Sequence, residues 1–372
     1  ETAKTWLPGG SPLKPGELVM QLDYAETLKT IAVEGVGALY GGAIGKAAVD
    51  YIQKEGGIIT LEDLTSYTTT HAKVVRGRYR GYDIVGPPPP TAGGVHVIEM
   101  LNILEGFDVA GLGFGTADGV HLLAEVLKIG FEDRRQYMGD PAFVDVPVDM
   151  LISHTHADSW RERIDMQRAR NVQTAYVAES PATTHMAAAD ADGNMISATH
   201  TIHAVFGCKA TVPGTGMILN NTMNIFDPHP GMANSIEPGK RVTSSMSPII
   251  VEKDGLPVFC VGLVGGIRIF PSALQASVHV IDHGRSPQEA VEASRIWTLG
   301  EDLEVEPGFS DAVLSELGQR GHQVSKQPIV GAGMGMIAQD GARLSGASCW
   351  RADGTPIGIG GGMARPGLRF SV

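Results

Sequence analysis

A predicted β-hairpin near the middle of the chain constrains the fold more than any other feature. Two strand-like stretches, 184–190 and 195–201, flank the segment DADGN, whose Asp-Gly pair is a strong hairpin turn signal. A turn centred on Asp192 places Thr183 opposite Thr201, although a bulge at the turn would shift this register by one residue. Opposed residues have Cβ atoms about 4.5–5.5 Å apart, so the two hydroxyls are predicted to share a hydrogen bond.

The paired threonines admit a structural and a catalytic interpretation. Threonine is common in strands because its side chain is β-branched, and a cross-strand pair needs no function. A threonine hydroxyl becomes a nucleophile when a base lies beside it, and the residue's own α-amino group supplies that base once the chain is cut before it. A cut between Ala182 and Thr183 would therefore create an N-terminal nucleophile.

Composition excludes several other classes of protein. The 372 residues, 43% of them hydrophobic, are enough for one large globular domain or two ordinary ones. A net charge of -12 without a long basic run argues against nucleic acid as a partner, and no apolar run is long enough to span a membrane. The three cysteines form no CxxC pair, so neither a disulfide framework nor a cysteine zinc site is indicated. A soluble chain is expected, and its compartment, bacterial periplasm or cytoplasm, stays open.

Helical periodicity dominates residues 20–140, and strand patterns follow after residue 183, which predicts an α+β fold. Ser286 and Ser310 are expected to cap two helices in the second half, over 286–295 and 310–321. The other expected helices cover 22–32, 44–51, 60–67, 95–104 and 118–138, and the expected strands cover 184–190, 195–201, 217–219, 248–252, 258–261 and 335–338.

The segment GPPPPTAGG, residues 86–94, cannot be helical because its four prolines lack donors and fix φ. It is predicted to be an extended connection that ends where the next helix begins. Two interpretations remain open for it, a loop near a functional site and a rigid linker.

Two motifs suggest other chemistry. His154, His156 and Asp158 have the HxHxD order of a metallo-hydrolase loop, but Ser159 stands where that pattern normally has a histidine. A metal-dependent hydrolase built on these three residues, which a chelator would inactivate, remains an alternative to a solvated helix start. The glycine-rich GAGMGM at 331–336 precedes a predicted hairpin rather than a helix, so it offers no pyrophosphate site.

Several motifs, in order, resemble those of the γ-glutamyltranspeptidase family. The small-subunit motifs are TTHMAAADADGNMISATHT, GMILNNTMNIFD, GKRVTSSMSPIIV and GLVGGIRIF, and the large-subunit motifs are YRGYDIVGPPPPTAGGVH, LNILEGFDVAGLGFGTADGVHLLAE and DRRQYMGDPAFVDVP. The resemblance implies an N-terminal nucleophile hydrolase with a four-layered αββα sandwich. Residues 1–182 would be the large-subunit portion and 183–372 the small subunit, together one intertwined domain. The family's N-terminal part, with its substrate-binding arginine, is not found here, which suggests that the chain starts late.

The resemblance implies a role for each matching residue. Thr183 would be the nucleophile, freed by autocatalytic cleavage of the Ala182–Thr183 bond, and Thr201 would hydrogen-bond it. Gly265 and Gly266 match the pair whose backbone N–H groups stabilise the tetrahedral oxyanion. The substrate carboxylate would be held by the matching serine pair, Ser244 and Ser245.

The sequence departs from the family where the donor's α-amino and α-carboxylate groups would bind. His203 replaces an asparagine, Thr222 a glutamine or glutamate, and Ile225 the acidic residue that anchors the amine. A donor ammonium beside Ile225 would be unpaired at a cost of about several kcal/mol, so a true γ-glutamyl donor is expected to bind badly. The segment 227–242 is also short where many relatives have a lid loop. Whether His203 binds a carboxylate or only packs stays open.

The resemblance therefore implies acyl transfer to water through an ester on Thr183, with no metal or cofactor, by a zymogen that cleaves itself into two subunits. Whether the ester also passes its acyl group to an amine stays open. The expected substrate is a small amide whose acyl group has a carboxylate but no amine, as for glutaryl-cephalosporin acylases and oxamate amidohydrolases. An authentic γ-glutamyltransferase or glutathione hydrolase, and a non-catalytic binding protein or stalled precursor, remain alternatives. A homo-oligomer is also open.

Overall fold

The computed structural model describes residues 1–172, 182–300 and 302–359. The chain divides into two compact units, the first made of Glu1–Ala72 with Ile202–Thr222 and the second of Lys73–Thr201 with Met223–Val372. The boundary between the predicted large and small subunits, at Thr183, falls inside the second unit. Each unit therefore contains residues from both predicted subunits.

The first unit consists of short helices held against a loop from much later in the chain. Thr27 donates a hydrogen bond to the Thr215 carbonyl at 2.8 Å, and the Trp6 and Phe206 rings lie 5.1 Å apart edge to face. A capping box between Thr60 and Asp63 begins the last helix, as the sequence predicts. The helices are α1 (Thr2–Trp6), η1 (Pro8–Gly10), α2 (Leu22–Glu34), α3 (Gly37–Tyr40), α4 (Ala43–Lys54) and α5 (Leu61–Thr65).

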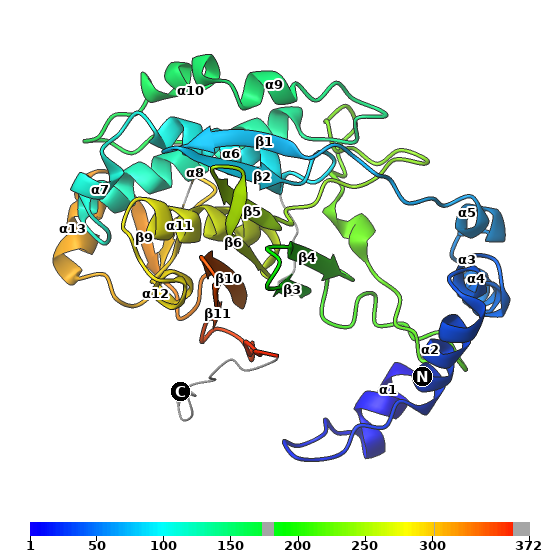
Figure 1. The fold of residues 1–372 in the computed structure, drawn as a ribbon. Coiled ribbons are helices and arrows are strands. Elements are labelled where there is room, and N and C mark those ends of the chain that lie inside the picture. Colours follow the sequence, from blue (N-terminus) through cyan, green and yellow to red (C-terminus); the bar gives the residue numbers. More distant parts are fainter. Residues whose placement is uncertain (173–181, 301, 360–372) are drawn as a thin grey trace. The chain divides into compact units, whose positions relative to one another are not determined.

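The second unit is built on a six-stranded antiparallel sheet in the order β1-β2-β5-β6-β10-β11 (Figure 1). A two-stranded sheet, β3-β4, and a three-stranded sheet, β7-β8-β9, lie in the same unit. The strands are β1 (Val75–Tyr79), β2 (Tyr82–Gly86), β3 (Thr183–Ala189), β4 (Met195–Thr201), β5 (Ile249–Lys253), β6 (Leu256–Leu263), β7 (Ile296–Trp297), β8 (Asp302–Val305), β9 (Gln323–Lys326), β10 (Met334–Asp340) and β11 (Arg343–Ser348).

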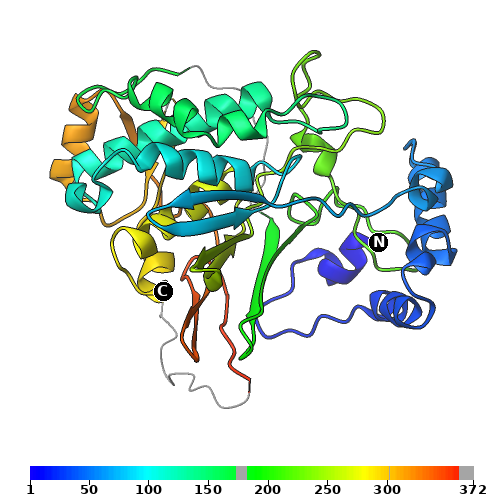
Figure 2. The ribbon, with the colours of Figure 1, turned by 45° about the horizontal axis from the view of Figure 1, so that its top comes forward.

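Helices cover one face of the six-stranded sheet, and the β3-β4 hairpin covers the other (Figures 1 and 2). Alternate residues of β6 show this division, because Val261 and Leu263 are buried in the main apolar core with the helices. Between them Gly262 faces His185 of the hairpin, and Cys260 lies 3.8 Å from the Ile196 carbonyl. The described residues of this unit thus form a helix layer, a sheet and a β-hairpin in succession.

The helix layer contains the long, buried helices of the second unit. Every residue of α6 is buried, and α6 packs against α8, α10 and α11. Thr116 caps α8 through the Gly119 N–H, and Ser153 caps α10 through the His156 N–H. The helices are α6 (Gly93–Leu104), α7 (Val109–Leu112), α8 (Ala117–Tyr137), α9 (Val148–Leu151), α10 (His154–Arg161), η2 (Thr222–Ile225), η3 (Gly266–Arg268), α11 (Ile269–Ile281), α12 (Pro287–Glu292) and α13 (Asp311–Gln319).

Most of the predicted elements are present, with three corrections. The predicted strand at 217–219 makes only an isolated bridge, Thr211 to Ile218, because neighbouring glycines at positive φ turn the chain there. The helix that begins after Ser286 ends at Glu292 rather than residue 295. The first half of the chain also contributes two strands, β1 and β2, to the main sheet. Among the described helices, none is both long enough and apolar enough to cross a membrane.

Candidate active site

The β3-β4 hairpin has the register that the sequence predicts. Thr183 pairs with Thr201 and His185 with Thr199, without a bulge. The turn is held by the Asp190 carboxylate, which accepts hydrogen bonds from the backbone N–H groups of Asp192 and Asn194 at 3.0 and 2.9 Å. The Asp-Gly turn therefore sets which side chains face each other at the far end of the hairpin.

A short chain of hydrogen bonds connects the two threonines to the peptide bond before Thr183. The Thr183 hydroxyl lies 3.3 Å from Thr201 Oγ1 and donates to it. The Thr201 hydroxyl in turn donates to the Ala182 carbonyl oxygen at 2.9 Å. Thr201 thus contacts both the predicted nucleophile, Thr183, and the carbonyl group that Thr183 would attack. A hydrogen bond donated to that carbonyl oxygen would stabilise the negative charge that develops on it during the attack.

His185 seats the hairpin on the sheet two residues after Thr183. Its Nδ1 lies 3.0 Å from Thr199 Oγ1, and a Cβ at Gly262 of β6 would overlap its ring. The pKa of His185 is lowered to about 4, first because the ring is buried and then because of the His200 charge. A neutral imidazole therefore packs on β6 just before that strand leads into Gly265.

Gly265 and Gly266 lie where β6 ends and η3 leads into α11. Their φ angles are +137° and +61°, and a Cβ on Gly265 would lie 3.2 Å from the Ala332 N, so side chains are disfavoured at these positions. The first N–H groups of a helix lack partners within it, which suits them to bind an anion.

Ser244 and Ser245 are buried, at 9% and 3% exposure, in the segment before β5. Since β5 runs antiparallel to β6 with Ile249 opposite Val261, continuing this register beyond the strands would bring the serine pair beside the glycine pair.

The proline-rich loop lies against this serine pair. The Ala92 N–H donates to the Ser244 carbonyl at 2.8 Å, and Ser244 Oγ lies 3.4 Å from Thr91 Oγ1. A Cβ on Gly93, the first residue of α6, would overlap Ser247. Of the two interpretations of this loop, the contacts favour a loop beside a candidate site over a plain linker.

Two of the three positions that depart from the family, Thr222 and Ile225, are the first and last residues of η2, and the boundary between the two units falls just after Thr222. Ile225 is half-buried in η2, and its carbonyl accepts a hydrogen bond from Asn234 Nδ2 at 2.9 Å. His203 and Thr222 belong to the first unit, whereas the paired threonines, the glycines and the serines belong to the second. His203 is buried with φ +73°, and burial lowers the pKa of its imidazole. The paired threonines, the glycines and the serines thus belong to one unit, and their catalytic roles, like the substrate contacts of His203 and Thr222, remain predictions.

The HxHxD motif does not form a metal site of its own. The three residues lie on α10, where the His154 side chain is 64% exposed and Asp158 pairs with Arg161. His156 points elsewhere, to Asp133 and Glu99. The hypothesis of a hydrolase built on His154, His156 and Asp158 is therefore wrong, because an α-helix spreads residues two positions apart around its circumference.

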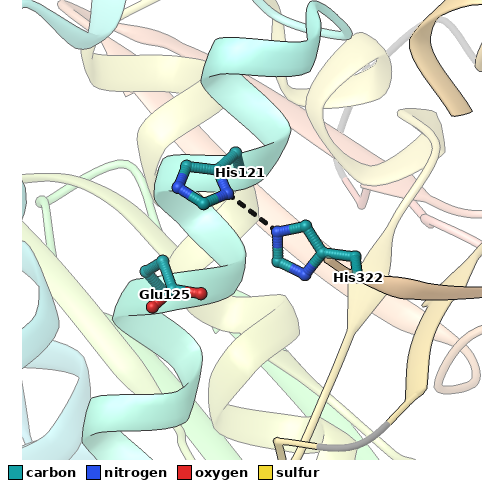
Figure 3. Close-up of side chains that lie close together, drawn as sticks. All are labelled: His121, Glu125 and His322. Atoms are coloured by element: carbon teal, nitrogen blue, oxygen red, sulfur yellow. Dashed lines mark hydrogen bonds between the residues drawn. The ribbon is translucent and has the colours of Figure 1, made fainter. Parts of the chain in front are cut away.

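Two buried clusters among the described residues have the donor types of metal sites, and sequence reasoning found neither of them. Figure 3 shows the first, in which His121 and Glu125 lie one turn apart on α8 and face His322. His121 Nδ1 is 2.8 Å from His322 Nε2, and His121 Nε2 is 2.8 Å from the Asp165 carbonyl. Glu125 is already paired with Lys128 at 2.8 Å. This cluster is a closed hydrogen-bond network that contains its own cation.

The second cluster consists of Glu99, Asp133 and His156, from three different helices. One feature of the sequence could have indicated a buried polar cluster here. His96, Glu99 and Asn102 are spaced three residues apart, which places one polar stripe on an otherwise apolar helix.

Comparison with solved structures defines the class of fold. The crystal structure of cephalosporin acylase from Bacillus halodurans matches with a TM-score of 0.88 and 30% sequence identity, over 97% of this chain and 66% of that chain. The chain, which includes the hairpin with the threonine pair, thus shares the fold of this structure.

Comparison with sequences defines the family. The family model described as gamma-glutamyltranspeptidase matches residues 1–359. The acylase ACY 1 proenzyme of Pseudomonas sp. (strain SE83) is 54% identical over 369 residues, which are 98% of this chain and 66% of that protein. The glutathione hydrolase proenzyme of Escherichia coli (strain K12) is 38% identical over 357 residues, 91% of this chain and 61% of that protein. The chain belongs to the γ-glutamyltranspeptidase family, and it spans slightly less than two thirds of the length of these relatives.

Proposed function

We propose that this chain is the precursor of an amide hydrolase that cleaves itself before Thr183 and then uses Thr183 as an N-terminal nucleophile. The observation that carries the proposal is the hydrogen-bond chain from Thr183 through Thr201 to the Ala182 carbonyl. The names of its relatives, an acylase proenzyme and a glutathione hydrolase proenzyme, support it. The proposed fold of the whole enzyme is the four-layered αββα sandwich, of which the helix layer, the six-stranded sheet and the β3-β4 hairpin would be three layers.

Self-cleavage would begin with attack of Thr183 Oγ1 on the Ala182 carbonyl carbon. The Thr183 hydroxyl proton would pass by way of Thr201 Oγ1 to the Thr183 nitrogen, while the Thr201 hydroxyl stabilises the charge on the Ala182 oxygen through its 2.9 Å hydrogen bond. With the nitrogen protonated, the C–N bond breaks, which transfers the acyl group to Oγ1 and leaves the Thr183 amine. Water then hydrolyses the ester, which gives a carboxylate at Ala182 and a free N-terminal threonine.

The same residues would then cleave substrate. The α-amine of Thr183 takes the hydroxyl proton, Oγ1 attacks the amide carbonyl, and the N–H groups of Gly265 and Gly266 stabilise the oxyanion. The amine product takes a proton and leaves, and water releases the acid from the ester. Ser244 and Ser245, buried near the start of β5, would bind a carboxylate on the acyl group.

The proposed donor is an acyl group that carries a carboxylate and lacks the α-amine. Ile225 supplies no charge to pair with an ammonium group, so a γ-glutamyl donor would lose an ionic contact that a glutaryl donor does not need. The similarity to a cephalosporin acylase supports an acylase rather than a γ-glutamyl hydrolase. The second candidate, glutathione hydrolysis, is favoured by the 38% identity to the E. coli relative.

Intact mass spectrometry of the purified protein at neutral pH tests the proposal directly. Two fragments that meet between Ala182 and Thr183 are expected from the wild-type chain, and only the uncut chain from Thr183→Ala. Thr201→Val keeps the β-branched shape but removes the hydroxyl, so its cleavage should slow by about tenfold or more. A wild-type chain that stays uncut, or a Thr183→Ala chain that is cut at the same bond, would contradict the mechanism.

A paired substrate assay tests the donor. The p-nitroanilides of glutaric acid and of γ-linked glutamate share the distal carboxylate and differ only in the α-amine, and the glutaryl compound should show the higher kcat/KM. Ile225→Asp should shift the ratio of the two kcat/KM values toward the γ-glutamyl compound by about tenfold or more, because it offers the amine a carboxylate. An unchanged ratio of the two kcat/KM values would show that the side chain at position 225 does not interact with the α-amine of the donor.

A further inference from the structure

Glu99, Asp133 and His156 turn their ligand atoms toward one point between helices α6, α8 and α10. One carboxylate oxygen of each acid and Nε2 of the histidine all lie within 4.8 Å of one another. His156 Nε2 is 2.7 Å from Asp133 Oδ2 and 3.5 Å from Glu99 Oε1. Oxygen and nitrogen atoms around a bound dication are about 3 Å apart, because each lies about 2.0–2.2 Å from the ion. Small side-chain adjustments would make these three atoms a ligand set.

The oxygen that faces His156 has no hydrogen-bond partner. Glu99 is fully buried, and its Oε1 accepts no hydrogen bond from any described residue. A buried carboxylate oxygen without a partner is costly, so such an atom calls for a specific explanation. A cation between the three side chains would supply the missing interaction.

The charges at the cluster also favour a cation. The buried carboxyl groups of Glu99 and Asp133 face each other closely enough to share a hydrogen bond, so a proton or a cation must lie between them. His156 adds a nitrogen within 3.5 Å of an oxygen of each carboxyl group. No buried lysine pairs with either carboxylate among the described residues, in contrast to Glu125 in the other cluster.

The candidate ligands have outer partners of the kind that orient metal-binding groups. His96 Nδ1 lies 2.5 Å from Glu99 Oε2, which leaves Oε1 directed at the cluster. Trp160 Nε1, by contrast, reaches the ligand atoms themselves, at 2.9 Å from Asp133 Oδ2 and 3.1 Å from His156 Nε2, so a metal would replace this contact. Hydrogen bonds to the far side of a ligand fix its orientation and raise its basicity.

From this geometry we propose that Glu99, Asp133 and His156 bind a zinc-like transition-metal dication, which would hold α10 against α6 and α8. One imidazole nitrogen and two carboxylate oxygens suit Zn²⁺ or Co²⁺ better than Mg²⁺, which prefers all-oxygen sites and retains its waters. The site is separate from the threonine nucleophile, so it does not depend on the proposed function.

Metal titration of the chelator-treated, full-length protein tests this proposal. Calorimetry with Zn²⁺ should show one strong site per chain, and Co²⁺ should produce visible absorption bands that Zn²⁺ removes. Glu99→Gln and Asp133→Asn should each weaken Zn²⁺ binding by more than about tenfold. The matched control is His154→Ala, two residues from His156 on the same helix, whose exposed ring should leave the affinity unchanged.

A second measurement needs no change to the ligands. In protein labelled with ¹⁵N-tryptophan, Co²⁺ should broaden the Trp160 indole signal first, because that N–H contacts Asp133. Trp160→Phe assigns the signal. The proposal is overturned if Glu99→Gln binds Zn²⁺ as tightly as wild type, or if the Trp160 signal is unaffected at one equivalent of Co²⁺. In that case Glu99 and Asp133 share a proton rather than a metal ion.

Discussion

Helix α8 takes part in two buried clusters that have nearly the same donor types and opposite electrostatics. His121 and Glu125 meet His322 and a buried lysine, so every ligand atom in that cluster has a partner and the carboxylate has its counter-charge (Figure 3). A few turns along the same helix, Asp133 meets Glu99 and His156, where one carboxylate oxygen has no hydrogen-bond donor. The comparison teaches that a set of potential ligands indicates a metal only where the protein leaves charge uncompensated.

Removing the lysine from the first cluster should have the largest effect. Lys128→Met takes away the Nζ that lies 2.8 Å from both Glu125 Oε1 and the Arg170 carbonyl. It leaves a buried carboxylate without its cation, which should lower the free energy of unfolding by about 3–5 kcal/mol. Denaturant unfolding measures the loss, and the double variant Lys128→Met/Glu125→Gln should recover part of it. A loss below about 1 kcal/mol would show that the cluster is not electrostatically closed.

A matched pair of substitutions compares the two clusters directly in metal-free protein. Glu125→Gln leaves the Lys128 ammonium buried without its counter-charge, whereas Glu99→Gln removes one of two facing carboxylates. The first should reduce the free energy of unfolding by about 2 kcal/mol or more, and the second should change it by less than about 1 kcal/mol. Equal losses in denaturant unfolding would mean that the clusters do not differ in charge balance.

Acid should weaken the first cluster through its histidines. The pKa of His322 is lowered to about 3, first by burial and then by the charges of Lys128, His121 and Arg320, and burial also lowers the pKa of His121. An unfolded histidine takes up its proton near pH 6.5, so between about pH 6.5 and 3 the unfolded state binds more protons. The unfolding free energy should therefore fall as pH falls through this range, by up to about 1.4 kcal/mol per pH unit for His322.

The pH dependence is checked by urea unfolding at several pH values. His322→Gln should flatten the decline relative to wild type. A variant that declines as steeply as wild type would assign the acid sensitivity to other groups.

The smallest effect is expected for His154→Ala. This side chain is 64% exposed and lies 3.9 Å from Glu105, a distance at which surface ion pairs contribute little. The free energy of unfolding should change by less than about 0.5 kcal/mol. A larger change in the free energy of unfolding would show that His154 of the HxHxD motif has a structural role, contrary to what its exposed position on α10 indicates.

The β3-β4 hairpin of the candidate site could be predicted from sequence because its pairing depends on residues close together in the chain. An Asp-Gly turn and alternating residues fix the register, and the register brings Thr183 opposite Thr201. The helices with polar and apolar faces, such as α2 and α4, were predicted for the same reason. Ser286 and Ser310 also cap helices as expected, although the first of these helices is shorter than predicted.

What the sequence did not reveal depends on contacts between distant segments. Helix α11 was missed because Pro271 in its first turn interrupts the apolar pattern; burial on every side is not the reason, since the fully buried α6 was predicted. Strands β1 and β2 were missed because charged residues such as Arg76 and Arg78 interrupt a short pattern. The two buried clusters combine residues from separate helices, and no spacing in the chain could have paired Glu99 with Asp133.

The six-stranded sheet gives the proposed cleavage a further consequence. Strand β2 comes from the part of the chain before Thr183 and β5 from the part after it, yet they pair as neighbours, with Ile84 opposite Val251. The two cleavage products would therefore share one sheet and unfold together. Refolding would differ, since what was a unimolecular reaction for the precursor would become an encounter between two chains whose yield depends on concentration. In dilute solution, cleaved protein that unfolds would thus not refold efficiently, so the chain would in effect fold once, before cleavage.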